Sequence, residues 1–387
     1  MTTRSTAIAL AGCAALAVAM GIGRFAFTPI LPMMQGEGGL DVAQGGWLAS
    51  ANYAGYLAGG LTAMRLRLGA RDAVRAGLAA VGVSTLAMGL THSMAAWLVF
   101  RGVAGLASAW VLVFASAWCL EQFQSHATPT RAPLLGAILF AGVGAGIAFA
   151  GAACVVLLLA GICAAGAWIS LGAVSLVVTA LTWNRFADSI GRGTVQAGDA
   201  SRWSNETVRL VACYGAFGFG YIIPATFLAA MARDALPDPA VYGLSWPLFG
   251  AAAAASTLVA AAWRGALSER AMWIAGHGVM AAGVAMPLAV PGVAGIMASA
   301  LLVGGMFMVV TMAGMQEARR IAGAQAARRV IAAMTSSFAV GQIAGPLVVS
   351  FLAARGHGFA PALAIAAAAL VASAFALAIR SPQPRTS

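Results

Sequence analysis

The sequence contains no lysine, and charged residues of all kinds make up only 9% of its 387 residues. Soluble domains usually carry about 25% charged residues, so this composition excludes an ordinary soluble domain. The 22 basic residues are all arginines, and they are scattered along the chain. A partner nucleic acid would need them gathered into a patch, which excludes that class of partner. The net charge of +11 instead suits loops at an anionic membrane surface.

Paired cysteines and catalytic motifs are also missing. The five cysteines lie in apolar runs without paired spacing, and the four histidines are far apart, so neither disulfides nor a metal site is expected. The chain has no H-E-x-x-H, G-x-S-x-G or phosphate-loop motif. It also lacks a channel selectivity motif and a soluble receptor domain. We therefore expect no cofactor, no metal and no enzymatic activity.

What the sequence does contain is long apolar runs. No Asp, Glu, Lys or Arg occurs in the 53 residues between Arg131 and Arg185, or in the 46 residues between Arg270 and Glu317. About 20 helical residues cross a hydrocarbon core of roughly 30 Å, so each run predicts two crossings joined by a hairpin. The hydrophobic fraction of 61% and the mean hydropathy of +0.89 agree. The chain is predicted to be an integral membrane protein.

Charges and turn residues divide the chain into twelve predicted transmembrane helices. They lie near 6–33, 42–64, 74–91, 94–120, 132–156, 161–183, 208–231, 240–263, 271–289, 292–315, 330–353 and 358–380. The apolar stretch after Arg4 resembles a cleavable signal, but it continues to Pro32, so we expect an uncleaved first crossing. With the N-terminus inside, only Arg233 and Arg355 among the loop arginines face outwards. This asymmetry predicts that both termini are cytoplasmic.

The predicted helices form two sets of six. Residues 184–207 are the one sizeable polar linker, and they separate residues 1–183 from residues 208–387. The two sets of helices show a weak similarity in sequence. Glycines recur in the fifth and eleventh spans, while Glu121 and Glu317 each precede a basic loop. The expected fold is all-α, with twelve transmembrane helices in two six-helix pseudo-repeats and a site between them near the bilayer midplane.

At this point the whole chain resembles the major facilitator superfamily. The run from Gly21 to Pro32 is similar to the first helix of bacterial YbfB/YjiJ-type transporters, as is the glycine run from Gly142 to Ile147. Arg101-x-x-x-Gly105-x-x-x-Ala109 resembles the arginine motif of the superfamily's fourth helix. The resemblance implies a bacterial inner-membrane carrier whose substrate the family does not define. It also implies that Arg101 hydrogen-bonds first-helix carbonyls and serves a proton-linked switch.

The loop motif between the second and third helices departs from the superfamily pattern. Arg67, Gly69 and Arg71 are kept, but Leu66 stands in the position of the usual aspartate. The aspartate-based latch between the two halves is therefore absent by resemblance. We expect Arg67 or Arg71 to pair with Glu121 instead.

Arg24 is the strongest candidate site residue. An arginine near the centre of a crossing costs about 2.5 to 3.5 kcal/mol even on the lenient insertion scale, so it needs a cavity or a partner. One interpretation is a substrate or gate residue between the halves. The alternative is an arginine that satisfies backbone carbonyls released by Pro29 and Pro32.

Other candidates are polar or aromatic residues inside spans. Those for the substrate cavity are Asn52, Tyr53, Tyr56, Tyr221, Trp246 and Gln342, and each also fits ordinary interhelical packing. Candidates for coupling or switching are Arg101, Glu121, Arg67, Arg71, Glu317 and His277. For His277 we favour a hydrogen bond between helices over a proton carrier. No Asp or Glu lies deep in any span, so no proton site is visible.

The sequence therefore predicts a monomeric secondary carrier that works by alternating access. Two buried arginines without deep acidic partners favour an anionic or amphipathic small molecule, with protons as the coupling ion. We favour efflux over uptake because the fourth-helix motif resembles that of proton antiporters. The alternative is a proton-coupled uptake permease for an organic acid or another metabolite.

Overall fold

The computed structural model describes residues 2–38, 40–63, 69–128, 130–186, 204–235, 238–262 and 267–379. Within these ranges the secondary structure is helical and contains no strand. Arg67 and most of the expected linker, residues 187–203, lie outside the described ranges. Long stretches of Ala, Leu, Val and Gly without charge form helices here because an apolar environment requires every backbone group to be bonded within its own segment.

The helices fall into two groups. The first helix group contains α1 (Thr2–Leu16), the π-helix η1 (Ala17–Ile22), α2 (Phe27–Gly36), α3 (Val42–Ala63), α4 (Ala70–Met88), α5 (Met94–His126), α6 (Ala132–Leu159) and α7 (Ala164–Thr182). The second helix group contains α8 (Asn205–Ala235), α9 (Pro239–Gly243), α10 (Ser245–Ala262), α11 (Glu269–Ala289), α12 (Val293–Ala353) and α13 (Ala360–Ala378).

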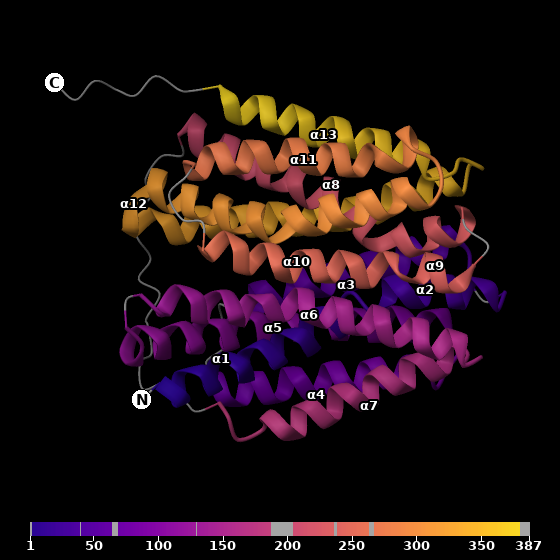
Figure 1. Ribbon diagram of the computed structural model, residues 1–387, viewed down its shortest axis with the longest axis horizontal. Helices are drawn as coiled ribbons and strands as arrows, with labels where there is room; N and C mark the ends of the chain where they lie inside the picture. Colours follow the sequence, from indigo (N-terminus) through magenta and orange to yellow (C-terminus); the bar gives the residue numbers. More distant parts are fainter. Residues whose placement is uncertain are drawn as a thin grey trace.

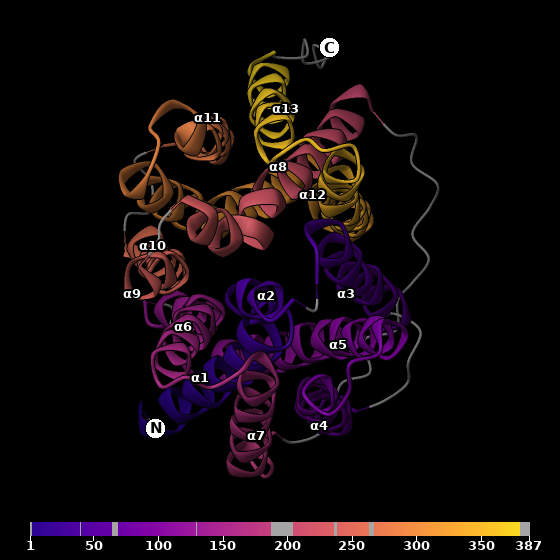
Figure 2. The same cartoon turned by 90° about the vertical axis from the view of Figure 1, so that its right-hand side faces the viewer.

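The long helices run roughly side by side, with the first group in the lower half of Figure 1 and the second group above it. Both chain termini lie at the same end of the bundle, which we call the terminus end, and the opposite end is the far end (Figure 1). Viewed from the far end, α2 faces α8 near the centre, while α3 lies beside α12 and α6 beside α10 (Figure 2). These three pairings join the two groups.

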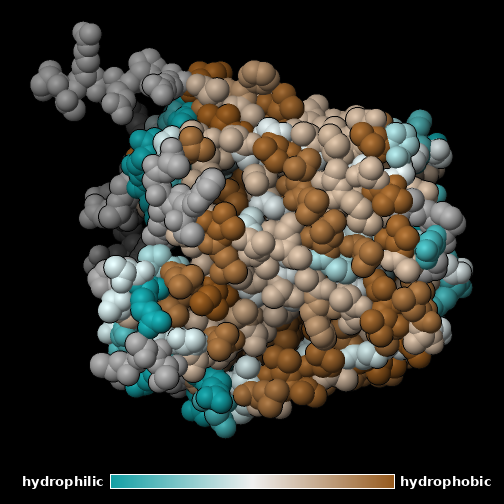
Figure 3. Space-filling model, in the orientation of Figure 1, coloured by the Kyte–Doolittle hydropathy of each residue, from teal (hydrophilic) through white to brown (hydrophobic). Residues whose placement is uncertain are grey.

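In the part of the chain that the structure describes, ten helical segments are long and apolar enough to cross a membrane. Brown, apolar side chains cover the flank of the bundle, and teal, polar side chains gather towards its ends (Figure 3). The predicted crossings 42–64 and 74–91 are helices α3 and α4, but they are too polar to be counted among the ten. In α4 the cause is the charge of Arg71, Asp72 and Arg75. That these two helices also cross the membrane remains a prediction.

Helix α12 corrects one expected boundary. The predicted loop between spans 292–315 and 330–353 is helical, because α12 continues without interruption from Val293 to Ala353. A straight helix of 61 residues would be about 90 Å long. The chain instead folds back, since Met334 Cε lies 3.6 Å from where a Cβ atom of Gly314 would be. The two apolar arms of α12 are Val293–Ala322 and Arg329–Ala353.

Candidate functional site

The predicted first crossing is broken near its middle. The chain passes from α1 into the π-helix η1, then through turns at residues 23–26 before α2 begins at Phe27. Glycines let this irregular backbone approach its neighbours closely: a Cβ atom on Gly23 would lie 2.8 Å from Ser108 Oγ and 2.8 Å from Val81 Cγ1. The break frees main-chain carbonyls inside the bundle, where they need donors.

Two buried side chains from neighbouring helices supply those donors. Arg101 on α5 donates from Nη1 to the carbonyl oxygen of Gly23 (3.2 Å) and from Nη2 to that of Arg24 (3.0 Å). Asn52 on α3 donates to the carbonyl oxygens of Gly23 (3.3 Å) and Arg101 (2.9 Å). The contacts that the superfamily resemblance implied for Arg101 are therefore present. Its part in a switch stays a prediction.

Arg24 projects from this break towards the second helix group. Its side chain is 2% exposed, and Nη2 donates to Gln342 Oε1 at 2.9 Å. Gln342, on the second arm of α12, in turn donates from Nε2 to the hydroxyl of Tyr221 on α8. The guanidinium carbon also lies 3.8 Å from the ring centroid of Tyr56 and 5.3 Å from that of Tyr53. The side chain thus reaches across the boundary between the groups instead of capping carbonyls released by Pro29 and Pro32.

Both buried arginines have neutral partners. No described Asp or Glu forms an ion pair with Arg24 or Arg101. Arg24 Nε, Arg101 Nε and Asn52 Oδ1 are buried and have no hydrogen-bond partner. Buried charge without a counter-ion is costly, so this region favours the approach of a negatively charged group.

Aromatic rings surround the Arg24–Gln342–Tyr221 chain. Tyr221 stacks on Phe307 (4.8 Å between ring centroids) and on Phe338 (5.5 Å), from the two arms of α12. Trp246 on α10 is fully buried and lies 6.2 Å from Phe25. The structure therefore brings all the predicted cavity residues, Asn52, Tyr53, Tyr56, Tyr221, Trp246 and Gln342, into the region where the two groups meet.

Sequence reasoning missed the phenylalanines and one threonine. Phe25, Phe307 and Phe338 complete the aromatic surroundings, and Thr226 shares a 3.0 Å hydrogen bond with the Tyr53 hydroxyl. Phe25 could have been identified from the sequence, because it directly follows the candidate Arg24. Phe307 and Phe338 had none, since phenylalanine in an apolar helix is ordinary and their proximity depends on the fold of α12.

Further hydrogen bonds between the groups lie beyond Arg24 towards the far end. Thr28 donates to Ala225 O (2.7 Å), Ser50 to Ile343 O (3.1 Å), Ser350 to Ala43 O (2.8 Å) and Arg233 to Pro32 O (2.7 Å). Together with the Tyr53–Thr226 and Arg24–Gln342 pairs they form what we call the far seam.

At the terminus end, several charged residues of the second group form ion pairs with one another. Glu317 is fully buried, accepts two hydrogen bonds from Arg320 (2.8 and 2.7 Å) and lies 3.7 Å from Arg270. Arg270 also pairs with Glu206, which pairs with Arg209. Helices α8, α11 and α12 are thereby joined at this end.

The expected partner of Glu121 is not confirmed. Arg71 and Glu121 are both exposed, and these two described residues form no ion pair with each other. The other expected partner, Arg67, lies outside the described residues. A pairing of Glu121 with Arg67 stays a prediction.

His277 differs from its expected bonding. It is fully buried in α11, and its Nε2 accepts a 2.9 Å hydrogen bond from Trp273 of the same helix. The predicted bond between helices is thus replaced by one along α11, because the Trp273 indole lies one turn away. Nδ1 has no partner. The nearest aromatic ring on another helix is that of Phe217 on α8, so His277 lies inside the second group.

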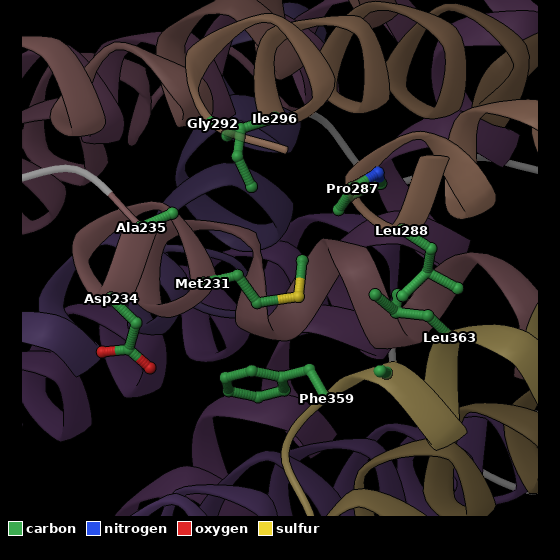
Figure 4. Close-up of a pocket in the computed structure, with 10 residues that line it drawn as sticks. Met231, Asp234, Ala235, Pro287, Leu288, Gly292, Ile296, Phe359 and Leu363 are labelled. Carbon is green, nitrogen blue, oxygen red and sulfur yellow. The ribbon is translucent and has the colours of Figure 1, made fainter. Parts of the chain in front are cut away.

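One cavity of about 280 Å³ opens at the far end, within the second group (Figure 4). Its lining is mainly apolar and includes Met231, Leu288, Phe359 and Leu363, with Asp234 at its edge (Figure 4). Asp234 pairs with Arg233 at 3.2 Å. Among the described residues, no cluster of His, Cys, Asp or Glu could hold a metal ion.

Comparison with known proteins identifies the family. A search of curated proteins finds no match. Residues 16–378 match the family described as uncharacterised MFS-type transporter YbfB. The match begins at the last residue of α1 and covers the other described helices, the break in the first crossing and every described site residue. The chain is therefore a multi-pass membrane protein that belongs to the YbfB family of MFS-type transporters.

Proposed function

We propose that this protein is a secondary active transporter that moves a small anionic molecule by alternating access. The observation that carries the proposal is the buried Arg24, which lies where the two helix groups meet and bonds to Gln342 of the opposite group. In this proposal twelve helices cross the membrane in two six-helix repeats. Residues 1–183 rock against residues 208–387, and the protein works as a monomer without cofactor or enzymatic activity.

The orientation follows from the arginines. Among the described arginines near helix ends, all but Arg233 and Arg355 lie towards the terminus end, so in this proposal that end faces the cytoplasm across a bacterial inner membrane. The far end then faces outwards. Because the far seam joins the groups on that side, the conformation described here is closed towards the outside. The opposite state requires these hydrogen bonds to break.

The site chemistry favours an anion. A substrate carboxylate would replace Gln342 as the acceptor for Arg24, exchanging a hydrogen bond to a neutral amide for an ion pair with an opposite charge. For the rest of the substrate, the site offers the apolar and aromatic side chains of Phe25, Phe307 and Trp246. An organic acid, or an amphipathic compound with an acidic group, meets both requirements.

We further propose coupling to protons, with efflux favoured over uptake because of the fourth-helix motif. Arg101 connects this motif to the break in the first crossing. An uptake permease for an organic acid is the alternative. The burial of His277 inside the second group makes it a poor proton carrier, because its hydrogen bond from Trp273 stays within α11 and no described hydrogen bond links it to the boundary between the groups.

Reconstituted vesicles test the proposal. The purified protein in liposomes is exposed to a panel of radiolabelled organic acids, amines and neutral solutes, with and without an imposed pH gradient. We expect saturable flux of one or more anions that responds to the gradient, and no comparable flux of cations. Flux restricted to cationic solutes would contradict the anionic site, and flux that never saturates would indicate a channel.

A further inference from the structure

We propose that a second cavity, at the terminus end of the first helix group, binds the phosphate of an anionic phospholipid headgroup. The cavity has a volume of about 410 Å³, within the range of roughly 300–1,000 Å³ typical of small-molecule sites. Its lining includes Arg4, Ile8, Trp118, Gln122, Asn184 and Arg185. None of these residues belongs to the central site, and the proposal does not depend on what the protein transports.

The cavity concentrates positive charge that no carboxylate within the described ranges neutralises. Arg4 on α1 and Arg185 after α7 both line it, and neither forms an ion pair with a described carboxylate. By contrast, Arg270 and Arg320 at the same end pair with Glu317. Two guanidinium groups that meet in one cavity suit a phosphate, whose oxygens accept their paired N–H donors.

The polar wall of the cavity is held in place by a third arginine. Arg75 on α4 donates to the carbonyl oxygen of Trp183 (2.7 Å) and to Oδ1 of Asn184 (3.0 Å). The side-chain oxygen of Asn184 accepts this bond from Arg75, so the side-chain nitrogen of Asn184 is the atom that can donate to a ligand. The segment after α7 is further held by Phe186, whose ring lies 5.3 Å from that of Trp118.

The surroundings favour a lipid over a free phosphate ion. Leu10 and Leu181 lie within one turn of Ala7 and Asn184, and they are 57% and 72% exposed. Such side chains face acyl chains on the flank of a membrane bundle. The cavity therefore opens where polar headgroups meet the hydrocarbon, with basic groups above and apolar surface beside it. Basic pockets in this position are suited to anionic headgroups.

The experiment measures lipid selectivity of the full-length protein. Wild-type protein is reconstituted in nanodiscs that contain equal amounts of phosphatidylglycerol and phosphatidylcholine, re-extracted, and its retained lipids are quantified by native mass spectrometry. We expect enrichment of phosphatidylglycerol. In R4Q/R185Q the preference should fall by about fivefold for each arginine removed. The control R131Q/R319Q removes two exposed arginines that do not line the cavity, and it should retain the preference.

A second variant guards against a folding defect in the first. Ala7 is exposed and lines the cavity, so A7W fills it while keeping both arginines, and it should also lose the preference. Equal loss in the R131Q/R319Q control, or wild-type protein without enrichment, would overturn the proposal. So would inorganic phosphate that competes with the lipid at millimolar concentration, because that result would indicate a site for a free anion.

Discussion

At the scale of single residues, Arg24 is held by neutral partners only. Gln342 accepts one hydrogen bond from it, and the ring of Tyr56 lies under its guanidinium group. A cation over an aromatic face gains about 2 kcal/mol or more when desolvated, which offsets part of the cost of burial. The arrangement keeps the charge inside the bundle without fixing it to a carboxylate, so an incoming anion meets no internal competitor.

Replacing Arg24 should therefore abolish transport without preventing insertion. In R24A we expect flux to fall by about tenfold or more, since a charge-assisted hydrogen bond contributes roughly 1.5–3 kcal/mol. R24K keeps the charge but loses the planar group that lies over Tyr56, so an intermediate rate is expected. Flux in proteoliposomes at matched protein density gives the measurement. Normal flux in R24A would remove this residue from the mechanism.

A carboxylate built into the site should imitate the substrate. In Q342E the new carboxylate lies beside Arg24 and forms an internal ion pair, which should raise the KM for an anion by about tenfold or more. Y221F is the matched control, because it removes only the hydroxyl that Gln342 contacts and leaves the Arg24 bond in place. We expect a smaller change in that variant, about twofold to tenfold, since a neutral hydrogen bond contributes only about 0.5–1.5 kcal/mol. A lower KM in Q342E would indicate a cationic substrate.

At the scale of elements, glycines decide how closely the broken first crossing packs. Gly146 on α6 faces Ala17 of η1, and a Cβ atom there would lie 2.6 Å from Ala17 Cα. Gly142 on the same face meets the backbone of Cys13 in α1. A spacing of four residues between glycines is typical of close helix packing, and the pairs Gly55/Gly59 and Gly341/Gly345 likewise meet backbone or side-chain atoms of neighbouring helices.

This packing makes a stability prediction. In G146A the added methyl group meets main-chain atoms that cannot rotate away, so we expect destabilisation by about 1–3 kcal/mol. Gly278 in α11 has open space where a Cβ would lie, so G278A should be neutral or stabilising by up to about 1 kcal/mol. Thermal unfolding of the purified variants in one detergent compares them. Equal melting temperatures for G146A and wild type would show that η1 shifts freely.

Element positions were largely predictable, whereas their irregularities were not. Apolar runs locate α6 and α7 to within about three residues, because hydrocarbon thickness sets their minimum length, whereas α5 continues to His126, past its predicted end at 120. The π-helix η1 and the helical reversal inside α12 arise from packing between distant segments. Alanine and glycine at residues 17–23, and alanine and arginine near 320–329, are compatible with several backbone paths. Local sequence cannot select among them.

At the scale of the whole molecule, the far seam keeps one side closed, and a covalent bond should lock it. Ser350 Oγ lies 2.8 Å from the Ala43 carbonyl, so cysteines at 43 and 350 are close. In a background without Cys13, Cys119, Cys154, Cys163 and Cys213, oxidised A43C/S350C should lose most transport, and a reductant should restore it. A43C alone and S350C alone should be unaffected by oxidant. Full transport by the cross-linked protein would contradict rocking about this seam.

The site itself was only partly predictable at this scale. An arginine inside an apolar crossing can be recognised from sequence because burying its charge is energetically costly, and Arg24 and Arg101 were identified for this reason. Gln342, Tyr53 and Tyr221 were candidates by type alone, and only the placement of α3, α8 and α12 around the break makes them neighbours of Arg24. The prediction of a bond between helices for His277 was wrong for the same reason, since only the folded structure shows that its partner is Trp273 on the same helix.

In the far seam, hydrogen-bond donors and acceptors are of different kinds. In most of its bonds the donor is a specific side chain, such as Thr28, Ser50 or Ser350, whereas the acceptor is a peptide oxygen that every amino acid possesses. Substitutions on the accepting side therefore leave the bond intact as long as the backbone keeps its course. Within the limits that packing sets, relatives that use the same closure should vary at Ala225, Ile343 and Ala43 while retaining hydroxyl groups opposite them.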